Sequence, residues 1–226
     1  MDITVGRKAI ADATEKLKNW GRWGKDDQIG TLNHIMPEDI VRAAGLIRTG
    51  KVFALGIPLD RQGPQAGLFG GRWNPIHTML ATGTDAVAGR YDKVPGIRYA
   101  DDAISMPVQA ATHWDSLGHI FYEEKMYNGF DAREVDCNGL GKLGIEHTRN
   151  KMVGRGVLLD VARFRGVPWL EDGESNSNRR ARQMRFYVKE LAEDCDADGI
   201  YEFFFCGAPL VITGGTGSPI NPQAIK

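Results

Sequence analysis

Glycine and proline residues, spread along the whole chain, limit the fold more than any other feature of the sequence. The 226 residues include 28 glycines and 10 prolines, with no internal repeat. Both residue types interrupt helices and strands and favour turns. We therefore expect many short elements joined by tight turns and not a helical bundle. The length suits one large domain, and we take residues 1–226 as that domain.

The hydrophobic pattern predicts an α/β chain. Apolar residues at helical spacing indicate helices, and short apolar or alternating runs indicate strands. The intervening residues 60–76 are rich in Gly, Pro and Gln and are expected to form a long loop, and the charged stretch 85–104 is expected at the surface. The predicted helices are 8–19, 37–50 and 184–195, and the predicted strands are 51–59, 105–115, 153–161 and 201–213.

Charge and cysteine content narrow the possible partners and the compartment. With 28 basic and 29 acidic residues the net charge is −1, which gives no electrostatic reason to expect nucleic acid or an anionic membrane. No signal-peptide-like or membrane-spanning apolar run is evident. The three cysteines have no metal-site spacing and are odd in number. A cytoplasmic protein that binds no nucleic acid or membrane is expected.

The segment Gln109–His119, QAATHWDSLGH, carries the most chemistry. If it begins as a strand, alternate side chains share a face, so Gln109, His113 and Asp115 could reach one ion. Imidazole and carboxylate are good ligands for Zn²⁺ and Mn²⁺, and either ion can activate water. The turn after Asp115 could return His119 over that face, where an imidazole can shuttle protons.

The spacing His-x-Asp-x₃-His is by itself a weak signal. Taken alone it favours a strand end whose histidines are hydrogen-bonded surface groups. That two of the five histidines of the chain fall within this segment shifts the balance slightly towards a functional site.

Further residues connect the segment to a known family. The segment resembles the signature His-x-Gly-Thr-His-x-Asp-x₃-His of the cyclase family of metal-dependent hydrolases, which includes bacterial kynurenine formamidase and isatin hydrolase. Thr112, His113, Asp115 and His119 match it, and Gln109 stands at the place of the first His. The resemblance extends over most of the chain, through the stretches 20–35, 71–79, 152–170 and 201–222.

This resemblance implies a fold and an activity. The expected fold is an α/β swivelling β/β/α type, whose mixed sheet has barrel character. The expected activity is hydrolysis of a small amide, lactam or ester. His113 and Asp115 would bind the metal and His119 would act as acid/base. Members of the family are usually dimers or tetramers, so a homo-oligomer with a small-molecule substrate is expected.

Two departures from the family pattern have consequences. Gln109 is a harder and weaker ligand than histidine, so the affinity for zinc should fall and manganese becomes relatively more plausible, and the expected cofactor is a divalent metal, Mn or Zn. Some members also use a later His and Glu, and this chain has no His after His147. The polar residues 171–183 are the place where an internal segment of the family would be missing. The alternative to an enzyme is therefore a non-catalytic relative that binds a small molecule or joins a hetero-oligomer.

Four more residues are candidates for substrate binding. The resemblance places the loop with Trp20 and Trp23 near the substrate, although both could equally be core or interface anchors. His77 could line the pocket opposite the metal, with a buried structural histidine as the alternative. Trp114, between His113 and Asp115, is included with them.

Overall fold

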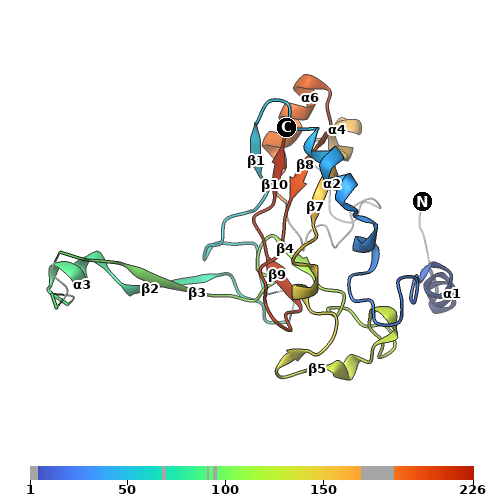
Figure 1. Cartoon of the computed structure of the whole chain (residues 1–226), viewed down its shortest axis with the longest axis horizontal. Helices are drawn as coiled ribbons and strands as arrows, with labels where there is room; N and C mark the ends of the chain where they lie inside the picture. The colour runs from blue at the N-terminus through green and yellow to red at the C-terminus, as the bar shows by residue number, and fades with distance from the viewer. Residues whose placement is uncertain (1–4, 68–69, 91, 94–95, 169–185) are drawn as a thin grey trace.

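The computed structural model describes residues 5–67, 70–90, 92–93, 96–168 and 186–226. These residues form a body with a slender arm that projects far from it (Figure 1). No helix in the described ranges combines the length and the apolar character needed to cross a membrane. The predicted joint at 171–183 and the start of the predicted helix at 184 lie outside the described residues.

A four-stranded sheet forms the upper part of the body. Its order is β1 (Val52–Ala54), β10 (Gln223–Ile225), β8 (Glu202–Cys206) and β7 (Val153–Val157), and every neighbouring pair is antiparallel. The apolar run of β8 packs into a core that contains Leu55, Leu191, Cys195, Phe203 and Ala224. Burial of this apolar surface stabilises the sheet and the helix that supplies Leu191 and Cys195.

Helices of two to three turns lie against this sheet. α6 (Lys189–Asp198) contributes Leu191 and Cys195 to the core and ends at Gly199, which has the left-handed φ of 70° that favours glycine at this position. α2 (Pro37–Ala44) packs on β7 and begins with a proline, and Asp39 accepts a hydrogen bond from the Met36 amide at 2.9 Å. α4 (Val161–Phe164) follows β7, and α1 (Arg7–Leu17) has no buried residue.

The remaining elements are short. The arm consists of β2 (Ile76–Ala81), α3 (Gly83–Val87) and β3 (Asp101–Ser105), and β2 and β3 pair antiparallel. Below the main sheet, β4 (His113–Asp115) pairs with β9 (Gly217–Pro219), and β5 (Val135–Asp136) pairs with β6 (Gly139–Leu140). The 3₁₀ helices are η1 (Gly30–His34), η2 (Tyr127–Gly129), η3 (Ala132–Glu134) and η4 (Ile145–Thr148).

The structure corrects the expected sheet architecture. All strand pairs between described residues are antiparallel, and no sheet among them closes into a barrel. The predicted mixed sheet with barrel character is therefore not found in the described chain. The broader α/β prediction is confirmed: a central sheet is flanked by a few helices.

The predicted strand 105–115 is also wrong. β3 ends at Ser105 and β4 begins only at His113. Between them the amide of Ala110 donates to the carbonyl of Pro107 at 2.9 Å and closes a turn. A turn of this kind takes the chain out of the extended conformation, so residues before and after it do not share a strand face. Other predicted elements are shorter than expected: the helix begun at Pro37 ends at Ala44, and the strand from Lys51 ends at Ala54.

Asp27 joins the N-terminal loop to the loop at η2. Its carboxylate accepts hydrogen bonds from the Tyr127 hydroxyl at 2.8 Å, the Asn33 amide at 2.7 Å and the Gly30 N–H at 2.9 Å. Burial raises the pKa of Asp27, but these hydrogen bonds lower it more, so the pKa lies below its usual value. Ionised Asp27 therefore stabilises the fold above its unfolded-state pKa of about 4, and this contribution is lost as the pH falls through the lower folded-state pKa.

We expect Asp27→Asn to lower the free energy of unfolding by about 1–2 kcal/mol at pH 7, with the difference from wild type shrinking towards pH 2. Urea unfolding at several pH values measures both effects. Asp26→Asn, which changes the exposed neighbouring carboxylate, is the matched control and should be close to neutral. A constant difference between Asp27→Asn and wild type across this pH range would contradict the role of the ionised carboxylate.

Candidate metal centre

The central segment is held in place by residues from the far end of the sequence. In the β4–β9 pair, His113 lies opposite Pro219 and Asp115 lies opposite Gly217. The pairing continues beyond the strand, where the Ser116 amide donates to the Thr216 carbonyl at 2.9 Å. The three residues of β4 thus have a fixed extended backbone, and His113 and Asp115, two positions apart, point to the same side.

His113 and Asp115 face each other, and each has one buried polar atom without a hydrogen-bond partner. The His113 side chain is 1% exposed, and its Nδ1 lies 2.6 Å from the Ala111 carbonyl oxygen. Because a carbonyl oxygen only accepts, Nδ1 carries the proton, which leaves Nε2 as the ring atom that can present a lone pair to an ion. Nε2 lies 3.3 Å from Asp115 Oδ1, and both are buried atoms without a hydrogen-bond partner. Leaving such groups unsatisfied costs about 1–3 kcal/mol each.

His119 completes this group of side chains. Its Nε2 is 3.8 Å from the same oxygen, Asp115 Oδ1, and its side chain is 19% exposed. Burial raises the pKa of Asp115, but His113, His119 and Arg72 lower it more, which keeps the carboxylate ionised at neutral pH. Burial, Arg72 and His113 lower the pKa of His119 more than Asp115 raises it. The His119 imidazole is therefore neutral near pH 7 and able to accept a proton.

Gln109 reaches the same region by a different route from the one expected. It is buried in the turn before β4, where its Nε2 donates to the Thr216 hydroxyl at 3.1 Å. A Cβ atom added to Gly217 would lie 2.7 Å from Gln109 Nε2, so the amide packs against the residue opposite Asp115. The turn, and not a shared strand face, brings Gln109 close to β4.

The side chains of His113 and Asp115 offer donor atoms of the kind that bind a divalent cation, although they are only two residues. Two unpaired buried atoms, one imidazole nitrogen and one ionised carboxylate oxygen, face each other, and these are ligands that Zn²⁺ and Mn²⁺ accept. Within the described ranges, no set of three or more His, Cys, Asp or Glu side chains is arranged to hold a metal ion. The fit therefore rests on His113 and Asp115, and the amide oxygen of the nearby Gln109 is a candidate for a further ligand among the described residues.

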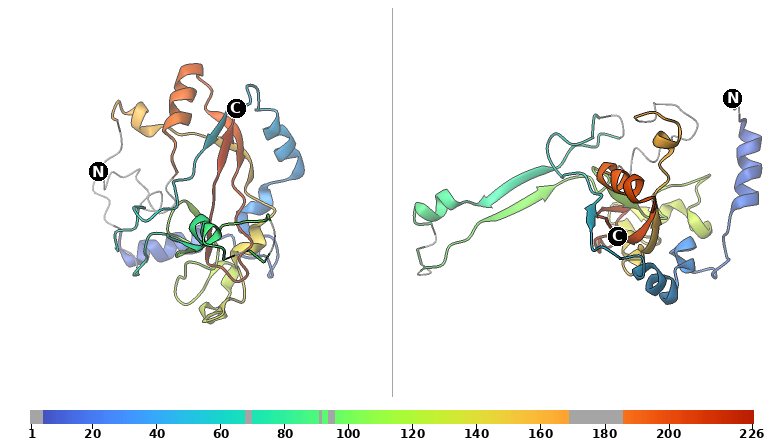
Figure 2. Two further views of the ribbon diagram at one scale, coloured as in Figure 1. Left: turned by 90° about the vertical axis from the view of Figure 1, so that its left-hand side faces the viewer. Right: turned by 90° about the horizontal axis from the view of Figure 1, so that it is seen from above.

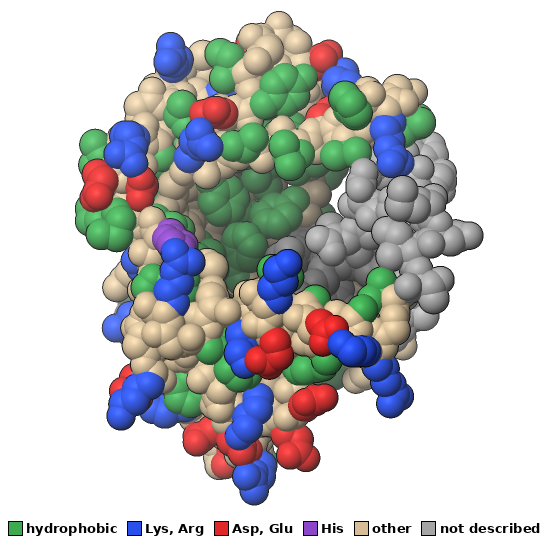
Figure 3. All heavy atoms as spheres, turned by 90° about the vertical axis from the view of Figure 1, so that its right-hand side faces the viewer, with side chains coloured by type: hydrophobic (Ala, Val, Ile, Leu, Met, Phe, Trp, Pro, Cys, Tyr) green, Lys and Arg blue, Asp and Glu red, His purple; other side chains and the backbone are tan. Residues whose placement is uncertain are grey.

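Trp114 points to the other side of β4, towards a separate cleft. Its indole Nε1 donates to the Gly207 carbonyl at 2.6 Å, and its ring packs edge-on against Phe205 at a centroid distance of 6.2 Å. The cleft has a volume of about 710 Å³ and lies between α2 and the β7–β8 edge. Figure 3, which faces the side where α2 lies in Figure 1, shows a hollow with hydrophobic side chains at its base. The cleft is lined by Trp114, Phe205, His34, Ile35, Leu46 and Arg155, among others.

The other candidate substrate-binding residues lie in different places. The ring of Trp23 packs edge-on against His34, a residue of the cleft, at 5.1 Å. Trp20 is 37% exposed and packs against the loop at Gly129. His77 lies on the arm, where its Nε2 is 2.6 Å from Asp102 Oδ2. The structure thus brings together His113, Asp115, His119 and the Gln109 region, and it places His77 on an element that points away from β4 (Figure 1).

Arg72 is the site residue that the sequence analysis missed. Its charge lowers the pKa of both Asp115 and His119. It lies in the stretch 71–79 that carried part of the family resemblance, but nothing in its spacing connects it to the motif that begins 37 residues later, at Gln109. Thr216 and Gly217 lie just beyond the predicted strand 201–213, and their pairing with the segment at β4 depends on a long-range contact that local spacing does not show.

We compared the chain with family models, curated proteins and solved structures. No family model matches the chain, and no curated protein matches it. Among solved structures, it is similar to a crystal structure of a novel cyclase, with 34% identity and a TM-score of 0.82 over 93% of this chain and 100% of that chain. A potential metal-dependent hydrolase with cyclase activity matches at 11% identity with a TM-score of 0.40, over 78% of this chain and 98% of that chain. A predicted metal-dependent hydrolase from Bacillus stearothermophilus matches at 12% identity with a TM-score of 0.39 and the same coverage. The last two likenesses are too low to support an argument.

The fold and the site define an α/β protein with a His–Asp centre beside an antiparallel sheet. The 34% identity over nearly the whole chain shows that it belongs to the cyclase family. Because this chain covers all of that solved chain, the comparison gives no sign of a missing internal segment, and the predicted gap at 171–183 stays a prediction.

Proposed function

We propose that the chain is a metal-dependent hydrolase that acts on a small amide, lactam or ester. The observation that carries the proposal is the pair of buried, unpartnered atoms, His113 Nε2 and Asp115 Oδ1, 3.3 Å apart. Membership of the cyclase family supports it. His113 and Asp115 would hold the ion, with Gln109 as a further candidate ligand, and Mn²⁺ or Zn²⁺ suits these donors. A divalent cation supplies Lewis-acid polarisation of the carbonyl group and activation of water.

Residues of the chain would orient the ligands, keep the carboxylate ionised and transfer the proton. The Ala111 carbonyl holds the His113 ring in the tautomer that leaves Nε2 free to bind. Asp115 stays ionised at neutral pH because His113, His119 and Arg72 favour its charge over the effect of burial. His119, neutral and partly exposed beside Asp115, takes a proton from the attacking water and returns it to the leaving group.

Metal content tests the proposed ligands directly. After incubation with Mn²⁺ or Zn²⁺ and removal of free ion, wild-type protein should retain about one equivalent, and His113→Ala should bind at least about tenfold more weakly. His147→Ala, which changes an exposed histidine, is the matched control and should retain the metal. Equal metal in wild type and His113→Ala would refute the proposed centre.

A second candidate function is a non-catalytic relative that binds a small molecule. The absence of a third His, Cys, Asp or Glu ligand among the described side chains favours it. Assays with N-formylkynurenine, isatin and simple lactones, each with added Mn²⁺ or Zn²⁺, separate the two. Turnover on any of these substrates supports the hydrolase, and metal binding without turnover on the whole panel supports the binding protein.

A further inference from the structure

The cleft beside α2 has the size and the lining of a small-molecule site. Its volume of about 710 Å³ falls within the range of about 300–1,000 Å³ that such sites occupy. Trp114, Phe205 and Leu46 contribute to its apolar lining, and Figure 3 shows the hydrophobic base from outside. In both views of Figure 2, α2, in blue, and α6, in orange, lie on different sides of the main sheet. The cleft therefore lies on the side of the sheet away from α6.

Strand β4 separates this cleft from the metal centre. Neighbouring residues of a strand point to opposite sides, so Trp114 points away from His113 and Asp115. The indole Nε1 donates to the Gly207 carbonyl at 2.6 Å and so holds the ring at the cleft, whose lining does not include His113 or Asp115. A molecule in the cleft would contact Trp114 and not the two residues proposed to hold the metal.

Two arginines at the cleft favour an anionic ligand. Arg42 comes from α2 and Arg155 from β7, and their side chains are 70% and 61% exposed. Arg42 pairs with Asp39 through Nη2, and Arg155 pairs with Glu202 through Nη1 at 3.4 Å. A guanidinium carries five N–H donors, so each arginine retains donors for a further acceptor.

The carboxylate in the lining, that of Asp39, is already engaged. Its Oδ2 accepts a hydrogen bond from the Met36 amide at 2.9 Å, and its Oδ1 pairs with Arg42. Two arginines against one aspartate leave the described lining with an excess of one positive charge. A cationic ligand would have to compete for Asp39, whereas an anion would meet guanidinium donors. The charges of the cleft therefore complement an acid and not an amine.

We propose that the cleft is a binding site for a small organic acid with an apolar body, separate from the metal centre. The apolar body lies against Trp114 and Phe205, where its burial favours binding. The carboxylate accepts charge-assisted hydrogen bonds from Arg42 or Arg155, whose planar guanidinium groups match a carboxylate in shape. Because the two contributions come from different parts of the lining, the site requires both parts of the ligand.

Calorimetric titration of the full chain with three probes tests the proposal. Octanoate should bind at least about tenfold more tightly than 1-octanol, which lacks the charge, and than acetate, which lacks the apolar chain. Octanoate should also change the tryptophan fluorescence, and Trp114→Phe should remove most of that change. Titrations with added Mn²⁺ and with a chelator should give the same Kd. No binding of octanoate, or equal binding of octanoate and 1-octanol, would overturn the proposal. Binding that requires Mn²⁺ would assign the acid to the metal centre and would also overturn it.

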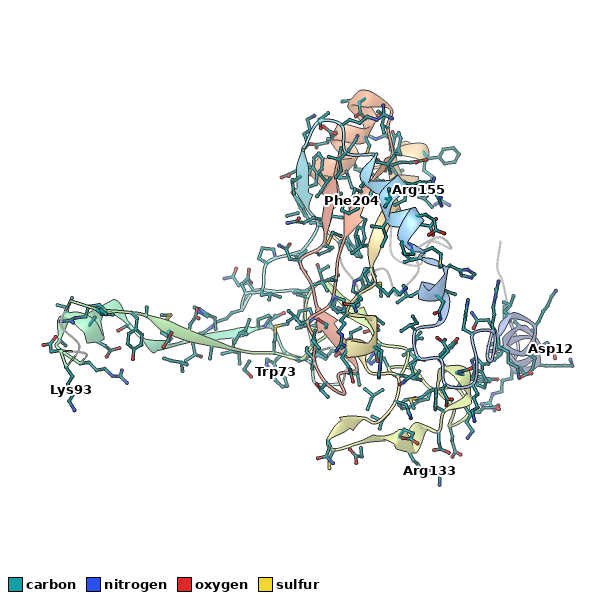
Figure 4. All side chains as sticks on the ribbon, viewed as in Figure 1. Asp12, Trp73, Lys93, Arg133, Arg155 and Phe204 are labelled. Carbon is teal, nitrogen blue, oxygen red and sulfur yellow. The ribbon has the colours of Figure 1, made fainter. Side chains whose placement is uncertain are left out.

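Variants of the two arginines test how the charge is recognised. The double variant Arg42→Gln/Arg155→Gln should bind octanoate at least about tenfold more weakly, with the affinity for 1-octanol and the circular-dichroism spectrum unchanged. Arg133→Gln is the matched control and should bind octanoate as wild type does. Arg133 is also an exposed, ion-paired arginine, and Figure 4 places it at the opposite end of the body from Arg155. Wild-type affinity for octanoate in the double variant would refute recognition of an acid by this cleft.

Discussion

His119→Gln is expected to lower kcat/KM by about 10²- to 10⁴-fold on any amide, lactam or ester that the protein hydrolyses, while leaving the bound metal unchanged. His119 Nε2 lies 3.8 Å from Asp115 Oδ1, too far for a direct hydrogen bond, and its neutral ring can accept a proton at neutral pH. Glutamine has a similar length and polarity but does not titrate, so the variant removes proton transfer and keeps hydrogen bonding.

Parallel measurements of turnover and metal content separate acid/base catalysis from metal binding. Loss of turnover at constant metal stoichiometry supports proton transfer by His119. Loss of metal together with turnover would instead make His119 a third ligand on the same face as His113 and Asp115. His147→Gln, on an exposed histidine, should change neither quantity. Unchanged kcat/KM in His119→Gln would contradict any part for this residue in the reaction.

The sequence predicted the local part of the site well. His113 and Asp115 are two residues apart, and a strand of only three residues suffices to point both side chains to one side. His119 follows through a short turn, in which its amide donates to the Ser116 carbonyl at 3.1 Å. Periodicity could not show that Pro107 begins a turn, and so the shared strand face proposed for Gln109 was wrong even though the turn brings Gln109 close to β4.

The parts of the site that the sequence did not predict depend on contacts between residues far apart in the chain. The pairing of β4 with β9 joins residues about one hundred positions apart, and local spacing contains no information on such a pair. Arg72 acts on Asp115 and His119 for the same reason, through space and not through sequence. The prediction that residues 85–104 lie at the surface is confirmed for the described part of this stretch, but the charge pattern did not show that the large apolar side chains between the charges are exposed as well.

Gly118 is the position in the motif where added volume should be least tolerated. A Cβ atom there would collide with Leu140 Cδ2 and would lie 3.2 Å from Leu143 Cβ and 3.3 Å from the Lys142 carbonyl oxygen. Leu140 and Leu143 belong to a buried cluster with Met126, so a shift of either side chain would disturb the packing of that cluster. Overpacking of this kind costs about 1–3 kcal/mol. Because Gly118 directly precedes His119, we expect Gly118→Ala to lower both the free energy of unfolding and any hydrolytic activity.

A double-mutant cycle with Leu140→Ala tests this cause. Leu140→Ala alone should cost about 2–5 kcal/mol, because it leaves a cavity in the cluster. The same change removes the atom that meets the new Cβ, so Gly118→Ala should cost about 0.5–3 kcal/mol less in that background than in wild type. Urea unfolding measures all four free energies.

Gly83→Ala, where nothing lies within 4 Å of the added Cβ, is the matched control and should be nearly neutral. If Gly118→Ala were as mild as Gly83→Ala, the close packing of the motif glycine on Leu140 would not hold. Additive free energies would mean that the strain falls on Leu143 and the Lys142 backbone instead.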